Sequence, residues 1–303
     1  MAKNLIVILG STASGKTRLA TRLAYELNGE IISADSRQVY RNMNIGTGKD
    51  LREYVVNGRP IPYHLIDVVD PEQEFSLFDY QKKFYEIFRD IRSKRALPIM
   101  VGGSGLYLES VICGYDLPEA PVIESVRNDL AGQTNEKLQR ILQELKPQLH
   151  NKTDLEDRER LIRAIEIEWA RKAEHPIRQE KPVVEAAVFG VQWERSVLRM
   201  RITNRLKERL NQGMIEEVSN LHAAGLSWSK LEHFGLEYRF ISQYLQKKIT
   251  FEEMKGSLNT AIHQFAKRQE TWFRRMEKKG VAIYWIKNDD YASIKEGVAR
   301  LIK

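Results

Sequence analysis

The chain has 303 residues, of which 42% are hydrophobic and 29% are charged, and its formal net charge is +7 at pH 7. This composition is ordinary for a folded globular protein and too polar for a protein built of membrane spans. The excess of positive charge favours phosphate-rich partners if it gathers on one face.

The start of the chain lacks the pattern of an export signal. Met1-Ala2-Lys3-Asn4 runs directly into the apolar Leu5–Leu9, with neither a long apolar region nor a small-residue cleavage site. Cys113 is the only cysteine, which excludes an intramolecular disulfide and a cysteine-based zinc cluster. We therefore expect a cytoplasmic protein without membrane association, and we expect the thiol of Cys113 to be buried.

The first third of the chain alternates short apolar runs with amphipathic segments. Leu5–Leu9 is rich in branched residues, which is typical of a strand buried on both faces of a parallel sheet. Such alternation predicts an α/β fold with a parallel sheet flanked by helices, whose ligands bind beyond the carboxyl ends of the strands. Strands are predicted at residues 5–9, 30–34 and 97–101, and helices at residues 17–27 and 78–92.

The pattern changes at about Gly114. A linker-like stretch at residues 116–121 is followed by charged helical patterns. We interpret residues 114–182 as an inserted all-helical domain, and residues 1–113 with 183–303 as the core. In the second part of the core we predict strands at residues 183–191 and 281–286, and long basic helices at residues 196–221 and 251–279.

A glycine loop lies between the first strand and the first helix. Its sequence matches G-x-x-x-x-G-K-[ST] in the position that a P-loop requires. Backbone amides and the helix N-terminus favour phosphate oxygens, Lys16 meets the terminal phosphates, and Thr17 can ligate magnesium. The motif therefore predicts binding of a di- or triphosphate with Mg²⁺, through Gly10, Ser11, Thr12, Ala13, Ser14, Gly15, Lys16 and Thr17.

The P-loop by itself does not identify the phosphate. In nucleotide hydrolases a second strand ends in an aspartate that helps to hold magnesium, whereas residues 97–101 lead into Gly102-Gly103-Ser104. This argues against an ATPase that merely binds RNA. Asp35 is an acid at another strand end, and in a small-molecule P-loop kinase it would accept the proton of a substrate hydroxyl. Such a kinase is the alternative function.

Further motifs follow the P-loop along the chain. They are Ile32–Tyr40, Met43–Thr47, Tyr63–Asp67, Gly102–Tyr107, Asp157–Ala164 and Ala266–Arg274. With these motifs the chain resembles the tRNA dimethylallyltransferases, also called tRNA isopentenyltransferases, over most of its length. Ser11 stands where that family commonly has proline, and Ser104 where it commonly has threonine. A glycine-tyrosine-basic segment is matched only loosely by Phe234–Arg239, from which we predict no site residue.

The resemblance implies a P-loop NTPase-like fold and a prenyl transfer. The donor would be dimethylallyl diphosphate, and the acceptor the exocyclic amine of the adenine on the 3′ side of the tRNA anticodon. The P-loop with Lys16 and a magnesium ion on Thr17 would stabilise the leaving diphosphate, while Asp35 accepts the amine proton. Ser104 would hydrogen-bond the base or the diphosphate. Two alternatives stay open. In them Asp35 caps a helix or contacts magnesium through water, and Ser104 serves only as a turn hydroxyl.

The acceptor adenine would have to leave its stack and enter a pocket. Asp35, Ser36, Arg37 and Gln38 are placed to read it. In the insertion the resemblance implies tRNA contacts by Arg127, Glu159, Arg160 and Arg163, which would otherwise form a solvated helix face. Lys267 and Arg268 lie among aromatic residues, which suits an RNA backbone. Arg201 and Arg205 would face the diphosphate or the RNA, and we assign Arg205 to the diphosphate. We expect a monomer.

Overall fold

The computed structural model describes residues 3–120, 124–146, 158–173 and 181–302. The chain divides into two compact units. One combines Met1–Tyr115 with Pro182–Lys303, and the other is Asp116–Lys181. The first unit contains the P-loop and a large sheet, so the architecture of this unit positions the predicted phosphate site.

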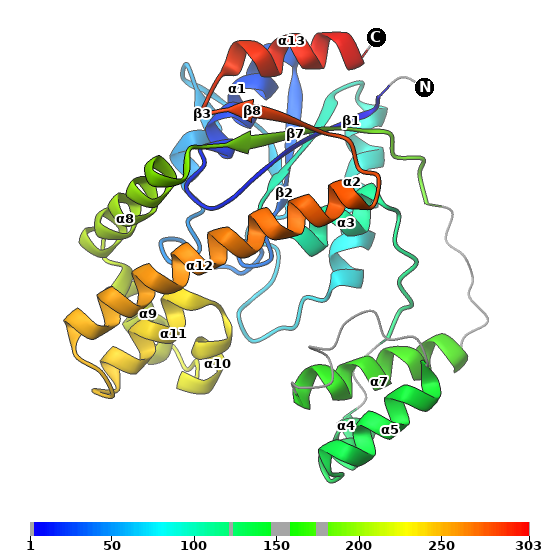
Figure 1. Ribbon diagram of the computed structural model, residues 1–303, viewed down its shortest axis with the longest axis vertical. Coiled ribbons are helices and arrows are strands. Elements are labelled where there is room, and N and C mark those ends of the chain that lie inside the picture. Colours follow the sequence, from blue (N-terminus) through cyan, green and yellow to red (C-terminus); the bar gives the residue numbers. More distant parts are fainter. Residues whose placement is uncertain (1–2, 121–123, 147–157, 174–180, 303) are drawn as a thin grey trace. The chain divides into compact units, whose positions relative to one another are not determined.

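The core of the first unit is a six-stranded sheet with the order β5-β2-β6-β1-β7-β8. Every pairing in it is parallel, and β1 lies between β6 and β7, with Val7 paired to both Met100 and Val188. All six residues of β1 are buried, as its continuous apolar run predicts. The predicted parallel α/β sheet is confirmed (Figure 1). The strands are β1 (Leu5–Gly10), β2 (Gly29–Ala34), β5 (Tyr63–His64), β6 (Leu97–Gly102), β7 (Ala186–Gln192) and β8 (Ile283–Lys287).

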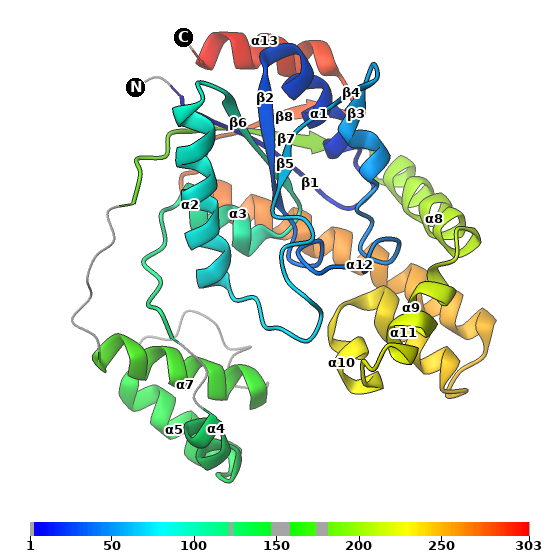
Figure 2. The ribbon, with the colours of Figure 1, turned by 180° about the vertical axis from the view of Figure 1, so that it is seen from behind.

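Helices cover both faces of this sheet (Figures 1 and 2). On one face α1 (Lys16–Leu27) and α13 (Tyr291–Leu301) bury a cluster that includes Ile6 and Ile8. On the other face Val7 and Leu9 pack with α2 (Leu77–Ser93), α3 (Gly105–Ile112) and the C-terminal half of α12 (Phe251–Lys278). Because alternate residues of β1 face opposite sides, one strand contributes to both cores.

Beyond the carboxyl ends of the strands, five helices form a third apolar cluster. The prediction of one helix over residues 196–221 is wrong, because Gly213 adopts a left-handed conformation with φ of 94° and separates two helices. Two further helices before α12 were not predicted. The members are α8 (Arg195–Asn211), α9 (Met214–Ala223), α10 (Trp228–His233), α11 (Leu236–Leu245) and the N-terminal half of α12.

Smaller elements complete the first unit. A short 3₁₀ helix η1 (Leu51–Tyr54) leads into a two-stranded ribbon of β3 (Val55–Val56) and β4 (Arg59–Pro60). The expectation of a buried thiol is wrong, because Cys113 follows the last turn of α3 and is exposed. Within the described residues, no helix is both long and apolar enough to cross a membrane.

The described part of the second unit contains the helices α4 (Glu124–Ala131), α5 (Asn135–Leu145) and α7 (Arg158–Ala173). They pack around an apolar cluster of their own, in which Leu138, Leu161 and Ile165 are fully buried. Asp157, the first residue of the motif Asp157–Ala164, lies outside the described residues.

Candidate active site

The P-loop leaves the sheet at Gly10 and enters α1 at Lys16. Within it, Ala13 and Gly15 have positive φ values of 61° and 84°. A Cβ atom on Gly10 would lie 2.6 Å from Oγ of Ser14 and 3.2 Å from the carbonyl of Val191, so the motif's first glycine is required by close packing. With these backbone conformations the loop leads directly into the N-terminus of α1, where a bound anion is stabilised.

Three side chains from distant parts of the chain hold this loop. Nε of Arg201 donates to the carbonyl of Ala13 at 2.9 Å, and Nε1 of Trp193 donates to the carbonyl of Ser14 at 2.8 Å. The third is Gln269, whose side-chain oxygen accepts from the amide of Thr12 at 2.8 Å. The phosphate-binding segment is therefore braced from α8, from the end of β7 and from α12.

Gln269 was not predicted as a site residue, although it lies in the motif Ala266–Arg274. Its amide nitrogen also donates to the carbonyl of Gly103 at 2.9 Å, which joins the P-loop to the end of β6. A signal was present, because Gln269 shares its buried helix face with Ala266, Phe273 and Met276. A polar side chain on an apolar stripe needs hydrogen-bond partners, which here are backbone groups of the site.

A cavity of about 900 Å³ opens beside the P-loop. It is lined by Lys16 and Thr17, by part of the segment from Asn44 to Glu53, and by one face of α8. Its size suits a small diphosphate ester. The cationic residues in its wall are Lys16, Lys49, Arg52, Arg201, Arg205 and Arg209.

The cavity is strongly electropositive. Burial and the charge of Arg205 lower the pKa of Lys16 to about 8, although Asp35 and Glu53 act in the opposite direction. Burial and Arg205 also lower the pKa of Arg209 to about 10. Arg205 contacts the hydroxyl of Thr12 at 3.4 Å and the carboxylate of Asp50. Cations whose pKa values are lowered by a neighbouring cation are stabilised by an incoming anion.

Asp35 follows β2, and Ser104 follows β6, at neighbouring strand ends. Oγ of Ser104 accepts from the amide of Ser36 at 3.0 Å, and Oδ1 of Asp35 accepts from the amide of Arg37 at 2.9 Å. Asp35 lies close enough to Lys16 to raise its pKa. The structure thus brings Asp35, Ser36 and Ser104 together beside the P-loop, with one carboxylate oxygen of Asp35 fixed by the turn.

Gln38 is engaged within the protein. Its side-chain oxygen accepts from Oγ of Ser33 at 3.2 Å, and its amide nitrogen donates to the carbonyl of Gly48 at 3.0 Å. Both ends of the amide therefore tie β2 to the loop that lines the cavity. Arg37, by contrast, is exposed.

The loop after β2 is fixed by the carboxylate of Glu217 on α9. It accepts from three successive backbone amides and from the hydroxyl of Tyr238, at distances between 2.7 and 2.9 Å. The three amides are those of Asn44, Ile45 and Gly46. Glu217 and Tyr238 were missed, and the loose match to a glycine-tyrosine-basic segment was the signal for Tyr238.

Comparison with known proteins decides the family. The IPP transferase family model matches residues 38–276, and the isopentenyl transferase model matches residues 3–69. The tRNA dimethylallyltransferase 1 of Syntrophus aciditrophicus is 54% identical over 302 residues, covering 98% of this chain and 97% of that protein. The chain belongs to the IPP transferase family.

Two solved structures agree with this membership. The tRNA isopentenylpyrophosphate transferase of Bacillus halodurans is 30% identical and superposes with a TM-score of 0.68, covering 98% of this chain and 97% of that one. The corresponding transferase of Staphylococcus epidermidis is 28% identical with a TM-score of 0.67 and 98% coverage of both chains. The P-loop-type α/β architecture is therefore that of IPP transferases.

In the second unit of this IPP transferase, two of the predicted tRNA-binding residues hold a buried carboxylate. Nε and a terminal nitrogen of Arg127 donate to Glu166 at 3.0 and 3.2 Å, and Arg163 donates to it at 2.9 Å. Glu159 and Arg160 are exposed on α7. Arg127 and Arg163 thus brace the helices of this unit around the carboxylate of Glu166.

On α12 of the transferase, Lys267 and Arg268 are exposed while their neighbour Gln269 is buried. The guanidinium of Arg268 lies 5.9 Å from the ring centre of Phe265, which is also exposed. The helix therefore presents cations and an aromatic ring on its outer side while its inner side holds the P-loop.

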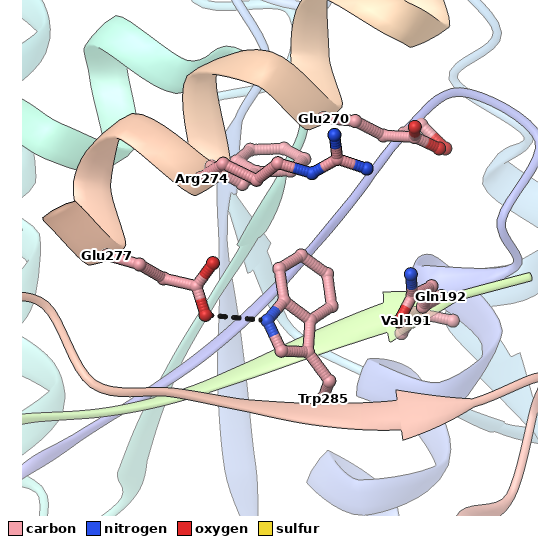
Figure 3. Close-up of a pocket in the computed structure, with 8 residues that line it drawn as sticks. Val191, Gln192, Glu270, Arg274, Glu277 and Trp285 are labelled. Carbon is pink, nitrogen blue, oxygen red and sulfur yellow. Dashed lines mark hydrogen bonds between the residues drawn. The ribbon is translucent and has the colours of Figure 1, made fainter.

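A second cavity, of about 90 Å³, lies behind the P-loop between α12 and the ends of β7 and β8 (Figure 3). Trp285 lines it and donates from Nε1 to Glu277 at 2.8 Å. Ser11 and Arg274 also line it. This volume suits a few waters and is too small for a diphosphate or a base, so we assign it no substrate.

Proposed function

We propose that this IPP transferase moves a dimethylallyl group from dimethylallyl diphosphate to the exocyclic amine of the adenine on the 3′ side of the tRNA anticodon, releasing diphosphate. The observation that carries the proposal is the cation-lined cavity at the P-loop, with Asp35 at the next strand end. Relatives named tRNA dimethylallyltransferase support it, and they disfavour a kinase.

The donor diphosphate binds at the N-terminus of α1, where the P-loop amides, Lys16 and Arg205 stabilise it. Mg²⁺ usually takes one or two protein ligands and completes its shell with phosphate oxygens and water. The hydroxyl of Thr17 lines the cavity and fits that requirement, and within the described residues no cluster of three or more His, Cys, Asp or Glu forms an all-protein metal site. When bound, Mg²⁺ neutralises charge on the leaving diphosphate.

Transfer forms a bond between the exocyclic nitrogen and the allylic carbon while the carbon–oxygen bond to the diphosphate breaks. The bonding electron pair leaves with the diphosphate, where Lys16 and Arg205 stabilise the charge that develops. The nitrogen loses a proton to Asp35, whose carboxylate is oriented by the amide of Arg37. Ser104 holds Ser36, and with it the turn that carries Asp35, in place.

The acceptor is held by residues spread over both units. Ser36, Arg37 and Gln38 lie nearest the transferred base, and Lys267 and Arg268 contact the RNA backbone from α12. Arg127, Glu159, Arg160 and Arg163 contact the anticodon stem-loop from the second unit. We propose that the enzyme is monomeric and acts in the cytoplasm.

One experiment tests the reaction. The purified protein is incubated with Mg²⁺, unmodified anticodon stem-loop and labelled dimethylallyl diphosphate, and the digested nucleosides are identified by mass. We expect isopentenyladenosine at the position 3′ of the anticodon, with one diphosphate released per transfer. Adenosine that stays unlabelled, with no diphosphate released from the donor, would contradict the proposal.

A further inference from the structure

Arg209 is a buried cation that the proposed reaction has not used. It lies on α8 one turn after Arg205, lines the 900 Å³ cavity and is only 9% exposed. Among the described residues, its Nε and one terminal nitrogen have no hydrogen-bond partner. Its carboxylate neighbours, Asp50 and Glu237, lie at 3.9 Å, beyond hydrogen-bond distance. A buried guanidinium left in this state is costly, unless a ligand completes its hydrogen bonds.

Gly48 provides the space for this side chain. A Cβ atom on Gly48 would lie 1.5 Å from a terminal nitrogen of Arg209 and 2.8 Å from one of Arg205. The φ of Gly48 is 65°, in the left-handed region that favours glycine. The loop is therefore shaped to admit two guanidiniums into one wall of the cavity.

Asp50 neutralises part of that wall. Its carboxylate contacts Arg205 directly and lies 3.9 Å from Arg209, while its side chain is 42% exposed. Asp50 thus sits at the mouth of the cationic site, where a negatively charged group of a substrate would also be attracted. The cavity lining holds the three carboxylates Asp50, Glu53 and Glu208 against six cations, which leaves an excess of positive charge that suits a polyanion.

We propose that Arg209 is a further binding residue for the donor diphosphate. Before the donor binds, the carboxylate of Asp50 takes the place of the diphosphate beside Arg205 and Arg209. This inference rests on the proposed function. On binding, Asp50 yields Arg205 and Arg209 to the phosphate oxygens, so donor affinity reflects a competition between Asp50 and the diphosphate.

The competition predicts opposite effects for the two partners of one ion pair. Inorganic pyrophosphate with Mg²⁺ is titrated calorimetrically into the wild type, Arg209→Met and Asp50→Asn. Arg209→Met should weaken binding by on the order of tenfold to a hundredfold, since charge-assisted hydrogen bonds are lost. Asp50→Asn should tighten binding several-fold. If the ion pair were merely structural, both variants would bind more weakly or neither would change, and either result overturns the proposal.

A matched control separates local from general charge effects. Arg199→Met removes a cation from the exposed side of the same helix, outside the cavity lining, and should leave pyrophosphate affinity within about twofold of the wild type. Thermal melting checks folding. If Arg209→Met does not fold, the exposed Asp50→Asn alone decides, and unchanged or weaker binding in it rejects the proposal.

The probe also separates this inference from the proposed function. Pyrophosphate binding involves neither tRNA nor a carbon centre. One outcome is a wild type that transfers no prenyl group while Arg209→Met and Asp50→Asn still shift pyrophosphate affinity in opposite directions. That result would reject the proposed reaction and keep the anion site. Normal prenyl transfer without these shifts in pyrophosphate affinity would keep the proposed reaction and reject the roles of Arg209 and Asp50.

Discussion

The side-chain oxygen of Gln269 accepts a hydrogen bond from the backbone amide of Thr12 at 2.8 Å. Through this bond, and the one that Gln269 donates to Gly103, helix α12 is attached to both strand ends that frame the site. The same helix presents Lys267 and Arg268 on its outer side. A single helix therefore links the diphosphate site to a basic surface proposed to contact tRNA.

Gln269→Leu should loosen the P-loop. The substitution leaves the amide of Thr12 and the carbonyl of Gly103 without their partner, which costs about 1–3 kcal/mol for each buried group that water does not reach. We expect lower unfolding free energy in urea together with a raised KM for the donor. Gln264→Leu, on the exposed side of the same helix, is the control and should change neither quantity. An unchanged donor KM in a destabilised Gln269→Leu would limit Gln269 to a structural role.

Asp35→Asn should slow transfer with little effect on tRNA affinity. Asparagine keeps an oxygen that accepts from the amide of Arg37, so the turn is preserved, but it is not a base. Loss of a general base lowers the single-turnover rate by about 10²- to 10⁴-fold. The rate is measured with saturating donor, and affinity by stem-loop titration. A wild-type rate in Asp35→Asn would exclude Asp35 as the base.

Donor binding should weaken as the pH rises through about 8. Burial and Arg205 lower the pKa of Lys16 to about 8, so its ammonium is charged below that pH and neutral above it. Only the charged form attracts the diphosphate, which means that donor KM rises from pH 7 to pH 9. Lys16→Arg stays charged over this range. Its donor KM, measured in parallel, should be flatter with pH, and equal slopes for both proteins would contradict the assignment.

Two of the arginines proposed to contact tRNA, Arg163 and Arg160 on α7, differ in their contacts within the protein. Arg163→Ala removes one of the guanidiniums that hold the buried carboxylate of Glu166, and should lower the stability of this unit by about 1–3 kcal/mol. Arg160→Ala alters an exposed position on the same helix. It should instead reduce the salt dependence of stem-loop binding by about one unit of slope. Melting curves and binding at several salt concentrations are the measurements, and an unchanged slope removes Arg160 from the interface.

The sequence by itself determined the local features of this protein. The run Leu5–Leu9, the P-loop and the start of α1 are contiguous in the chain, and each is defined by its own residues, so strand, loop and helix were predicted to within one residue. The family motifs were local as well. The predicted helix over residues 196–221 was wrong because Gly213 adopts a left-handed conformation, which the helical spacing of its neighbours concealed.

Tertiary structure alone decided which distant groups complete the site. Gln269 and Thr12 are 257 positions apart, and Arg209 reaches its place only because Gly48, in a different loop, lacks a side chain. Neither relationship has a period or spacing in the sequence. Hydrogen bonds and steric fit depend on distances in space, which arise only when the parallel sheet brings its strand ends together and the helices pack against them.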